Sequence, residues 1–209
     1  MKSLINNIAK WMLALGLVVS TSAAFAEVAP DALVKTTAED VLNIIKSDKD
    51  IQAGNQTKIF ALAEDKILPN FNFDRVSRIV LGKNWNSATK EQQDAFQKEF
   101  KTLLIRTYAS ALSKYKNQTI DYKPLRSQPS DTEVSVKTQI NQPGGQPIEV
   151  DYSLAKETDG WKVFDIVIEG VSLVTNYRGQ FNDVVRQSGM DGLIQKLVEK
   201  NKSNASSKS

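Results

Sequence analysis

The sequence contains neither cysteine nor histidine among its 209 residues. Without thiols the chain can form no disulfide and offers no thiolate nucleophile, and without imidazole it has no Ser–His pair and no histidine ligand for zinc. The P-loop, the G-x-G-x-x-G phosphate loop and the EF-hand calcium loop are also absent from the sequence. We therefore expect neither a metal site nor a cofactor.

The first 26 residues have the features of a secretory signal peptide. Lys2 and Lys10 give a positive start, Trp11–Val19 is a short apolar run, and Ala24–Ala26 forms an A-x-A cleavage site. The apolar run is too short to span a bilayer. We expect an exported protein that is located in a bacterial periplasm.

Charge is nearly balanced in the remaining chain. Without Lys2 and Lys10 it carries 25 basic and 24 acidic residues, a net charge of +1. A nucleic-acid partner is not expected, because binding one needs a clustered basic face. An exported chain without disulfides must be held together by its core, so we predict one domain over residues 27–199. Residues 200–209 are only Ser, Lys, Asn and Ala, and they are predicted to form a disordered tail.

Hydrophobic periodicity predicts helices in the first half of the chain. Apolar residues recur at helical spacing in Ala29–Lys46, Gln56–Leu68 and Phe71–Leu81, and Gly82 is a candidate for a left-handed helix end. A longer helix follows a capping-box pattern in Thr89–Gln92. Its aromatic-rich stripe includes Phe100, Leu104 and Tyr108.

The second half begins with an alternating pattern that is typical of strands. Four predicted strands form an antiparallel meander: Ile120–Tyr122, Asp131–Ile140, Ile148–Leu154 and Trp161–Ile168. Two further helices are predicted after Gly170, over Val171–Gln187 and Met190–Glu199. The pattern as a whole favours an α+β fold in which about six helices close one face of a curved four-stranded sheet.

Asp165 interrupts the most apolar strand and has two interpretations. Buried without a partner, it could act as an acid or a base. We favour a structural carboxylate that accepts hydrogen bonds from backbone amides or pairs with an arginine, and Tyr177–Arg178 could supply that partner. The large apolar side chains are equally open to two interpretations, because they suit a solid core and a greasy pocket alike.

Three stretches carry a resemblance to a known family. They are L-P-N-F-N-F-D-R-V-S-R-I-V-L-G-K-N-W (Leu68–Trp85), A-T-K-E-Q-Q-D-A-F-Q-K-E-F (Ala88–Phe100), and the segment Gly160–Phe181 with its continuation Gly189–Leu197. In order and spacing they resemble the periplasmic phospholipid carriers of the MlaC, or toluene-tolerance, family. The motifs W-K-V-x-D-x-x-x-E-G-V-S-L-V-x-N-Y-R and L-G-x-x-W are highly specific together, and the match covers nearly the whole mature chain.

The resemblance implies an NTF2-like cone, in which a twisted four-stranded sheet and helices surround an apolar pocket. It also implies a carrier that is not an enzyme and that shuttles glycerophospholipid across the periplasm, maintaining the lipid asymmetry of the outer membrane. The implied partners are an outer-membrane lipoprotein–porin complex and an inner-membrane ABC transporter with its substrate-binding subunit. Strand parity and the helix stripe then predict these tail-lining residues: Phe100, Leu104, Tyr108, Val136, Val150, Tyr152, Val163, Val167, Val171 and Val174.

Two alternatives remain. One is a non-catalytic assembly adaptor for the transporter, and the other is an enzyme on an NTF2-like fold that uses Asp165. A substitution of Asp165 distinguishes the enzyme from a carrier, and pocket-blocking substitutions distinguish the adaptor.

Overall fold

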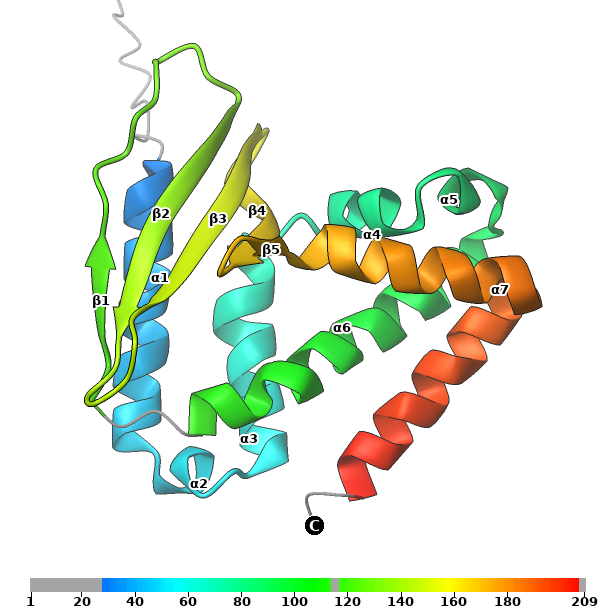
Figure 1. The fold of residues 1–209 in the computed structure, drawn as a ribbon, viewed down its shortest axis with the longest axis horizontal. Coiled ribbons are helices and arrows are strands. Elements are labelled where there is room, and N and C mark those ends of the chain that lie inside the picture. The colour runs from blue at the N-terminus through cyan, green and yellow to red at the C-terminus, as the bar shows by residue number, and fades with distance from the viewer. Residues whose placement is uncertain (1–27, 114–116, 207–209) are drawn as a thin grey trace, which may run out of the picture.

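The computed structural model describes residues 28–113 and 117–206 (Figure 1). The predicted signal peptide lies outside these residues. Among the described residues, eight helical elements precede the sheet: α1 (Pro30–Ser47), α2 (Lys49–Gln52), α3 (Gln56–Leu62), the π helix η1 (Ala63–Ile67), the 3-10 helix η2 (Leu68–Asn70), α4 (Phe73–Leu81), α5 (Lys83–Ser87) and α6 (Lys90–Ser113). The sheet then begins with β1 (Thr119–Tyr122). The predicted helices are confirmed, but the one expected over Gln56–Leu68 changes to π and 3-10 geometry after Leu62. The short helices α2 and α5 were not predicted.

Local capping explains where the best-defined helices begin and end. The backbone amide of Gln92 donates to Thr89 Oγ1 (3.2 Å), and the amide of Thr89 donates back to Gln92 Oε1 (3.1 Å). This reciprocal pair is the predicted capping box at the start of α6. Gly82 ends α4 with the positive φ (55°) expected of it, but its ψ of −127° differs from the predicted left-handed helical conformation.

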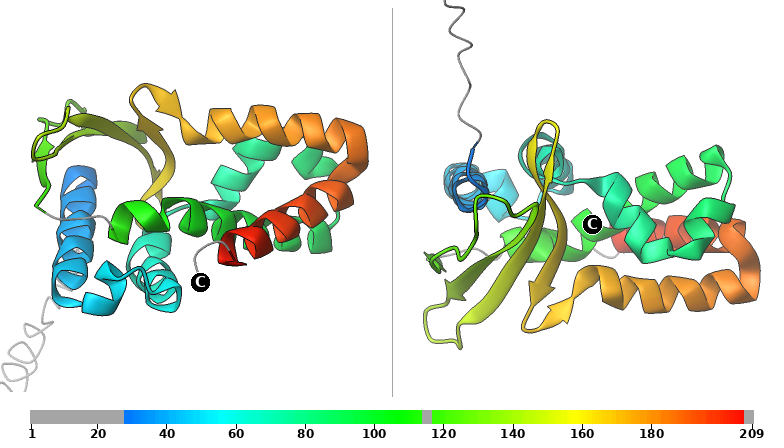
Figure 2. Two further views of the ribbon diagram at one scale, coloured as in Figure 1. Left: turned by 60° about the horizontal axis from the view of Figure 1, so that its bottom comes forward. Right: turned by 90° about the horizontal axis from the view of Figure 1, so that it is seen from above.

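The sheet is antiparallel throughout, with the strand order β1-β2-β3-β4-β5. Its longer strands are β2 (Glu133–Asn141), β3 (Ile148–Glu157) and β4 (Gly160–Ile168). Figure 2 shows the sheet as an arch whose concave side faces α1 and the C-terminal part of α6. This is the expected α+β arrangement of a curved sheet closed by helices.

A fifth strand corrects the predicted four-stranded sheet. β5 (Val171–Ser172) pairs with the end of β4, where the chain reverses at Glu169 (φ 50°) and Gly170 (φ 77°). Two successive residues with positive φ are typical of a tight hairpin turn. Val171 therefore belongs to a strand, and the following helix, α7 (Leu173–Ser206), begins two residues later than predicted.

α7 folds back on itself at Gly189 (φ 69°, ψ −176°), so that its second half returns along α6 (Figure 1). Two helices separated at this glycine were predicted. The return helix continues to Ser206, although a disordered tail was predicted from Lys200. Asn201 anchors it, because its buried Nδ2 donates to the backbone oxygen (2.9 Å) and to Oε2 (2.8 Å) of Glu99. Residues 207–209 lie outside the described part of the chain.

The buried apolar residues form three clusters. The largest joins α4, α5, α6 and α7, the second joins α1, α2, α3 and α6, and the third lies between α1 and the sheet. Within residues 28–113 and 117–206, no helix has the length and hydrophobicity that crossing a membrane requires. The three clusters meet around an unfilled space, which is the candidate site.

Candidate functional site: an apolar cavity

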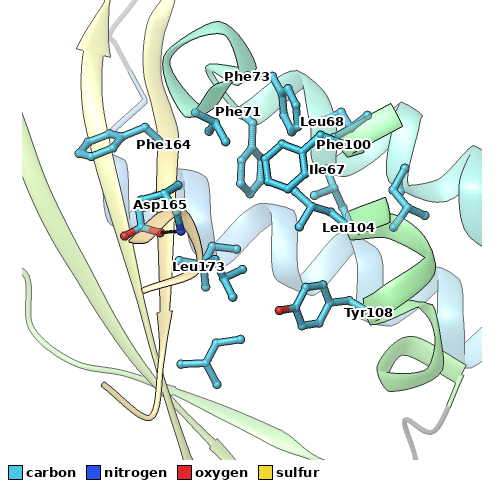
Figure 3. A pocket seen from close by; sticks show the side chains of 16 residues that line it. Ile67, Leu68, Phe71, Phe73, Phe100, Leu104, Tyr108, Phe164, Asp165 and Leu173 are labelled. Carbon is cyan, nitrogen blue, oxygen red and sulfur yellow. Dashed lines mark hydrogen bonds between the residues drawn. The ribbon is translucent and has the colours of Figure 1, made fainter. Parts of the chain in front are cut away.

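A cavity of about 250 Å³ lies between β4 and the helices that face it (Figure 3). We call it the first chamber. Its walls come from the segment between α3 and α4, from α4 itself, from one stripe of α6, from β4 and from the start of α7. The described residues that line it are Ala63, Ile67, Leu68, Phe71, Phe73, Val76, Phe100, Leu104, Ile105, Tyr108, Phe164, Asp165, Ile166, Ile168, Leu173 and Val174.

A second chamber of about 200 Å³ lies beside the first, between α1 and the sheet. α1 contributes one face of it, and Tyr152, Val163 and Asn70 contribute to the other. Ile67, Phe71 and Ile166 line both chambers, so these three side chains form the wall between them. Small-molecule pockets commonly measure about 300–1,000 Å³, a range that the two chambers reach only together.

Asp165 is the only charged side chain among the described residues that line the first chamber. Its Oδ2 accepts a hydrogen bond from Ser172 Oγ (2.6 Å), and its Oδ1 accepts one from the backbone amide of Val174 (3.1 Å). Ser172 Oγ in turn accepts from the amide of Thr175 (3.1 Å). The carboxylate therefore ties β4 to the N-terminus of α7. This is the predicted structural role, although its partners are Ser172 and Val174 rather than Tyr177–Arg178.

Tyr108 is the other polar residue of this wall, and Figure 3 shows its hydroxyl directed into the first chamber. Burial raises the pKa of Tyr108 above its usual value, and the nearby Tyr177 raises it further. The phenol is therefore neutral at physiological pH, so it adds no charge to the chamber. Among residues 28–113 and 117–206, no group of acidic side chains is placed to hold a metal ion.

Comparison with known proteins agrees with this architecture. Residues 35–199 match the family described as "MlaC protein". The chain belongs to the MlaC family. Its relatives include the intermembrane phospholipid transport system binding protein MlaC of Haemophilus influenzae, which is 26% identical over 91% of this chain and 92% of its own length. The toluene tolerance protein ttg2D of Pseudomonas putida is 26% identical over 78% of this chain and 75% of its own.

A solved structure similar to this one is that of the phospholipid-binding protein from Ralstonia solanacearum, determined in complex with a phospholipid. It is 45% identical to this chain, and the two structures superpose with a TM-score of 0.80. The superposition covers 84% of this chain and 98% of the other. The Haemophilus relative of this MlaC-family chain is thus named for phospholipid transport and the Ralstonia protein for phospholipid binding.

The predicted tail-lining residues divide between several places in this MlaC-family fold. Phe100, Leu104, Tyr108 and Val174 line the first chamber, and Tyr152 and Val163 line the second. Val136, Val150, Val167 and Val171 line neither chamber. Contact between lipid tails and any of these residues stays a prediction.

The four residues outside the chambers lie in different surroundings. Val136 is buried beneath α1 together with Val34, and Val150 is also buried, at 6% exposed. Val171 is 55% exposed, since the hairpin at Glu169 and Gly170 carries it outward.

Val167 was assigned to the cavity by strict alternation from Val163, and a β-bulge makes that assignment wrong. β3 residues Ser153 and Leu154 pair with Asp165 and Val163 respectively, so Phe164 is an extra residue in β4. A bulge reverses which side chains face inward. Beyond it, Ile166 and Ile168 line the first chamber in place of Val167.

Some of the wall residues that the sequence did not indicate lie between α3 and α4. Ile67, Leu68 and Phe71 surround Pro69, where the helical pattern ends and no strand pattern begins. The adjacent apolar pair Ile67–Leu68 before a proline was a signal that these residues line a wall. Neighbouring residues on a helix do not lie on one face, so one of the pair had to face something other than the helix's own core side.

Proposed function

We propose that this protein is a phospholipid carrier that holds acyl tails in its two apolar chambers. The observation that carries the proposal is a first chamber whose single charged group, Asp165, already has both oxygens engaged by the protein. Apart from the neutral hydroxyl of Tyr108, the rest of this wall is apolar and suits hydrocarbon. The phospholipid bound by the 45% identical Ralstonia protein supports the same ligand class here.

The energetics of carrying a lipid through water favour this kind of site. At about 0.8 kcal/mol per methylene, exposing two tails of roughly 30 methylenes in total would cost on the order of 25 kcal/mol. A carrier has to replace most of that apolar environment. None of the described residues lining either chamber is lysine or arginine, so we expect the head group to stay outside and to be little discriminated.

The cellular route belongs to the same proposal. The protein would be exported by its signal peptide and would carry lipid across the periplasm. It would work between an outer-membrane lipoprotein–porin complex and an inner-membrane ABC transporter with its substrate-binding subunit, thereby maintaining outer-membrane lipid asymmetry. The name of the Haemophilus relative, which refers to an intermembrane phospholipid transport system, supports this route. We propose no catalysis, since the Haemophilus and Ralstonia proteins are named for transport and binding and the Asp165 carboxylate serves as a brace.

The direct test is to purify the mature chain without detergent, extract it with organic solvent and identify bound lipid by mass spectrometry. Transfer of labelled phospholipid between donor and acceptor vesicles then measures carriage. We expect phospholipid in the extract and transfer that rises with protein concentration. A protein that carries no lipid after gentle purification and acquires none from vesicles would contradict the proposal, and partner binding without lipid would favour an assembly adaptor.

A further inference from the structure

The wall between the two chambers, which we call the septum, is built from two sides. Ile67 and Phe71 come from the connection between α3 and α4, and Ile166 comes from β4. All three side chains are half-buried, and each lines both chambers. Moving one of them would join the two spaces.

Neither chamber alone has room for a long acyl tail. An apolar cavity of about 150 Å³ holds one benzene, or roughly 25 Å³ per carbon. On this scale the first chamber (about 250 Å³) holds about ten carbons and the second (about 200 Å³) about eight. A tail that reaches the middle of a hydrocarbon core about 30 Å thick has roughly 15 methylenes. Such a tail fits only if it passes the septum.

The two helical-side members of the septum differ in how firmly they are held. Phe71 pairs with Val163 of β4 in an isolated bridge, and the amide of the next residue, Asn72, donates to Val163 O (3.0 Å). These backbone contacts fix Phe71 to the sheet. Ile67, in contrast, closes the π helix η1 (Ala63–Ile67), and its side chain packs only partly against the cluster between α1, α3 and α6.

The π helix gives Ile67 a second available position. A π turn accommodates one residue more than an α turn, and such turns occur mostly as single insertions, frequently at functional sites. If η1 relaxed to α geometry, the residues after it would rotate by about 100° around the helix axis. That rotation would withdraw Ile67 from the septum, while Ala63 at the start of the turn kept its place in the wall.

We propose that Ile67, positioned by the π turn, is the gate between the chambers and determines the length of acyl chain that the protein accepts. This inference rests on the proposed function. Chains of up to about ten carbons fill the first chamber with the gate closed. Longer chains displace Ile67 and continue into the second chamber.

The test measures binding of single-chain lysophosphatidylglycerols with tails of about 8 to 16 carbons, below their micelle-forming concentrations. With the wild-type protein, affinity should rise about fourfold for each added methylene up to about ten carbons and then more slowly. Ile67→Ala removes the gate, so the fourfold increments should continue beyond ten carbons. Deletion of Glu64, an exposed residue of the π turn, removes the extra residue, so the turn becomes α-helical while Ile67 keeps its place in the septum. The gate can then no longer withdraw, and affinity should stop rising beyond about ten carbons.

Ile44→Ala is the matched control. Ile44 is also a half-buried isoleucine packed against the same cluster, but it lines neither chamber. It should leave the break at about ten carbons unchanged. If the Glu64 deletion does not fold, as judged by thermal unfolding, Ile67→Ala decides alone.

The possible outcomes separate this inference from the proposed function. An identical length profile in the wild type, Ile67→Ala and Ile44→Ala would overturn the gate while leaving the carrier intact. Failure of the wild type to bind any chain length would overturn the carrier itself.

Discussion

The helical half of the molecule and the arch beneath its sheet use the same kinds of apolar residue in opposite ways. In the helical half, Phe73, Phe96, Phe100, Tyr177 and Phe181 form an aromatic cluster with ring centroids 5.1–5.7 Å apart. Under the arch, mainly aliphatic side chains leave two chambers unfilled. Phe100 belongs to both regions, since it has four of the ring contacts and also lines the first chamber.

The difference indicates a division of work between stability and binding. An unfilled apolar volume lacks the packing contacts of a solid core, so the chambers lower the stability of the lipid-free protein. Aromatic pairs contribute about 0.5–1.5 kcal/mol each beyond the burial of their area. We infer that the dense aromatic cluster offsets the open chambers and keeps the lipid-free protein folded.

The largest expected effect comes from opening the aromatic cluster. Phe96 is fully buried, contacts Phe100 and Phe181, and does not line the first chamber. Phe96→Ala should lower the free energy of unfolding by about 3–5 kcal/mol, because it leaves a cavity in a close-packed region. Urea unfolding of the lipid-free protein measures this loss. The folded fraction should bind lipid with unchanged affinity, and a loss of affinity at full folding would show that the two regions are not separate.

A polar substitution in the chamber wall should have the reverse effect: a large loss of lipid affinity and a small loss of stability. Leu104 is half-buried and lines the first chamber. Leu104→Gln should weaken lipid binding by about 10–100-fold, because a bound tail would bury an amide without a partner at about 1–3 kcal/mol. The lipid-free protein should lose only about 1 kcal/mol, since the amide can be hydrated in the empty chamber.

Ile79→Gln is the control for this prediction. Ile79 is also half-buried, but it packs against the core cluster of the helical half and lines no chamber. It should reduce stability and spare lipid affinity. Equal effects of the two substitutions on vesicle transfer would remove the distinction between the regions.

Local sequence signals predicted the helical half better than the arch. The capping box at Thr89–Gln92 and the end of α4 at Gly82 depend on a few neighbouring residues; the capping box is confirmed, and Gly82 ends α4 with a positive φ. The bulge at Phe164 depends on how β4 pairs with β3, which no local pattern records. It reversed the inward parity that had assigned Val167 to the cavity.

The chamber walls show the same limitation in another form. Leu104 and Tyr108 lie on a helix stripe, and the regular period placed them in the wall. Ile67 and Phe71 come from a π turn and an irregular connection, whose geometry is set by contacts with β4 and α1. The septum therefore could not be read from periodicity. The family resemblance indicated a pocket but not how that pocket is divided.

Substitution of Asp165 tests the connection between the two regions. Its carboxylate links β4, a wall of the first chamber, to the beginning of α7, which continues into the helical half. Asp165→Ala should lower the free energy of unfolding by about 1–2 kcal/mol, as for loss of a helix N-cap, and Asp165→Asn by less. Thermal or urea unfolding measures both variants. A carrier with either substitution should still transfer lipid once folded, whereas abolished activity in fully folded Asp165→Asn would revive the enzyme hypothesis.

The smallest expected effect concerns Tyr122, at the edge of the sheet over the arch. Its hydroxyl is buried and has no hydrogen-bond partner within residues 28–113 and 117–206, and burial raises the pKa of Tyr122 to about 12. In the unfolded chain this phenol ionises near pH 10, where the folded protein still holds it neutral. Its contribution to stability is therefore present below pH 10 and is lost as the pH rises toward 12. We expect that loss to be about 1 kcal/mol after screening by solvent.

Tyr122→Phe isolates this contribution from those of the other tyrosines. At pH 7 the change should alter the free energy of unfolding by less than about 1 kcal/mol, in the direction of higher stability, because an unsatisfied hydroxyl is removed. Urea unfolding at pH 7 and at stepwise higher pH should show the variant losing less stability than the wild type between pH 10 and 12. Substantial destabilisation at pH 7 would instead mean that the arch packs tightly around its polar groups. The arch would then resemble the aromatic cluster of the helical half, and the contrast between the two regions would fail.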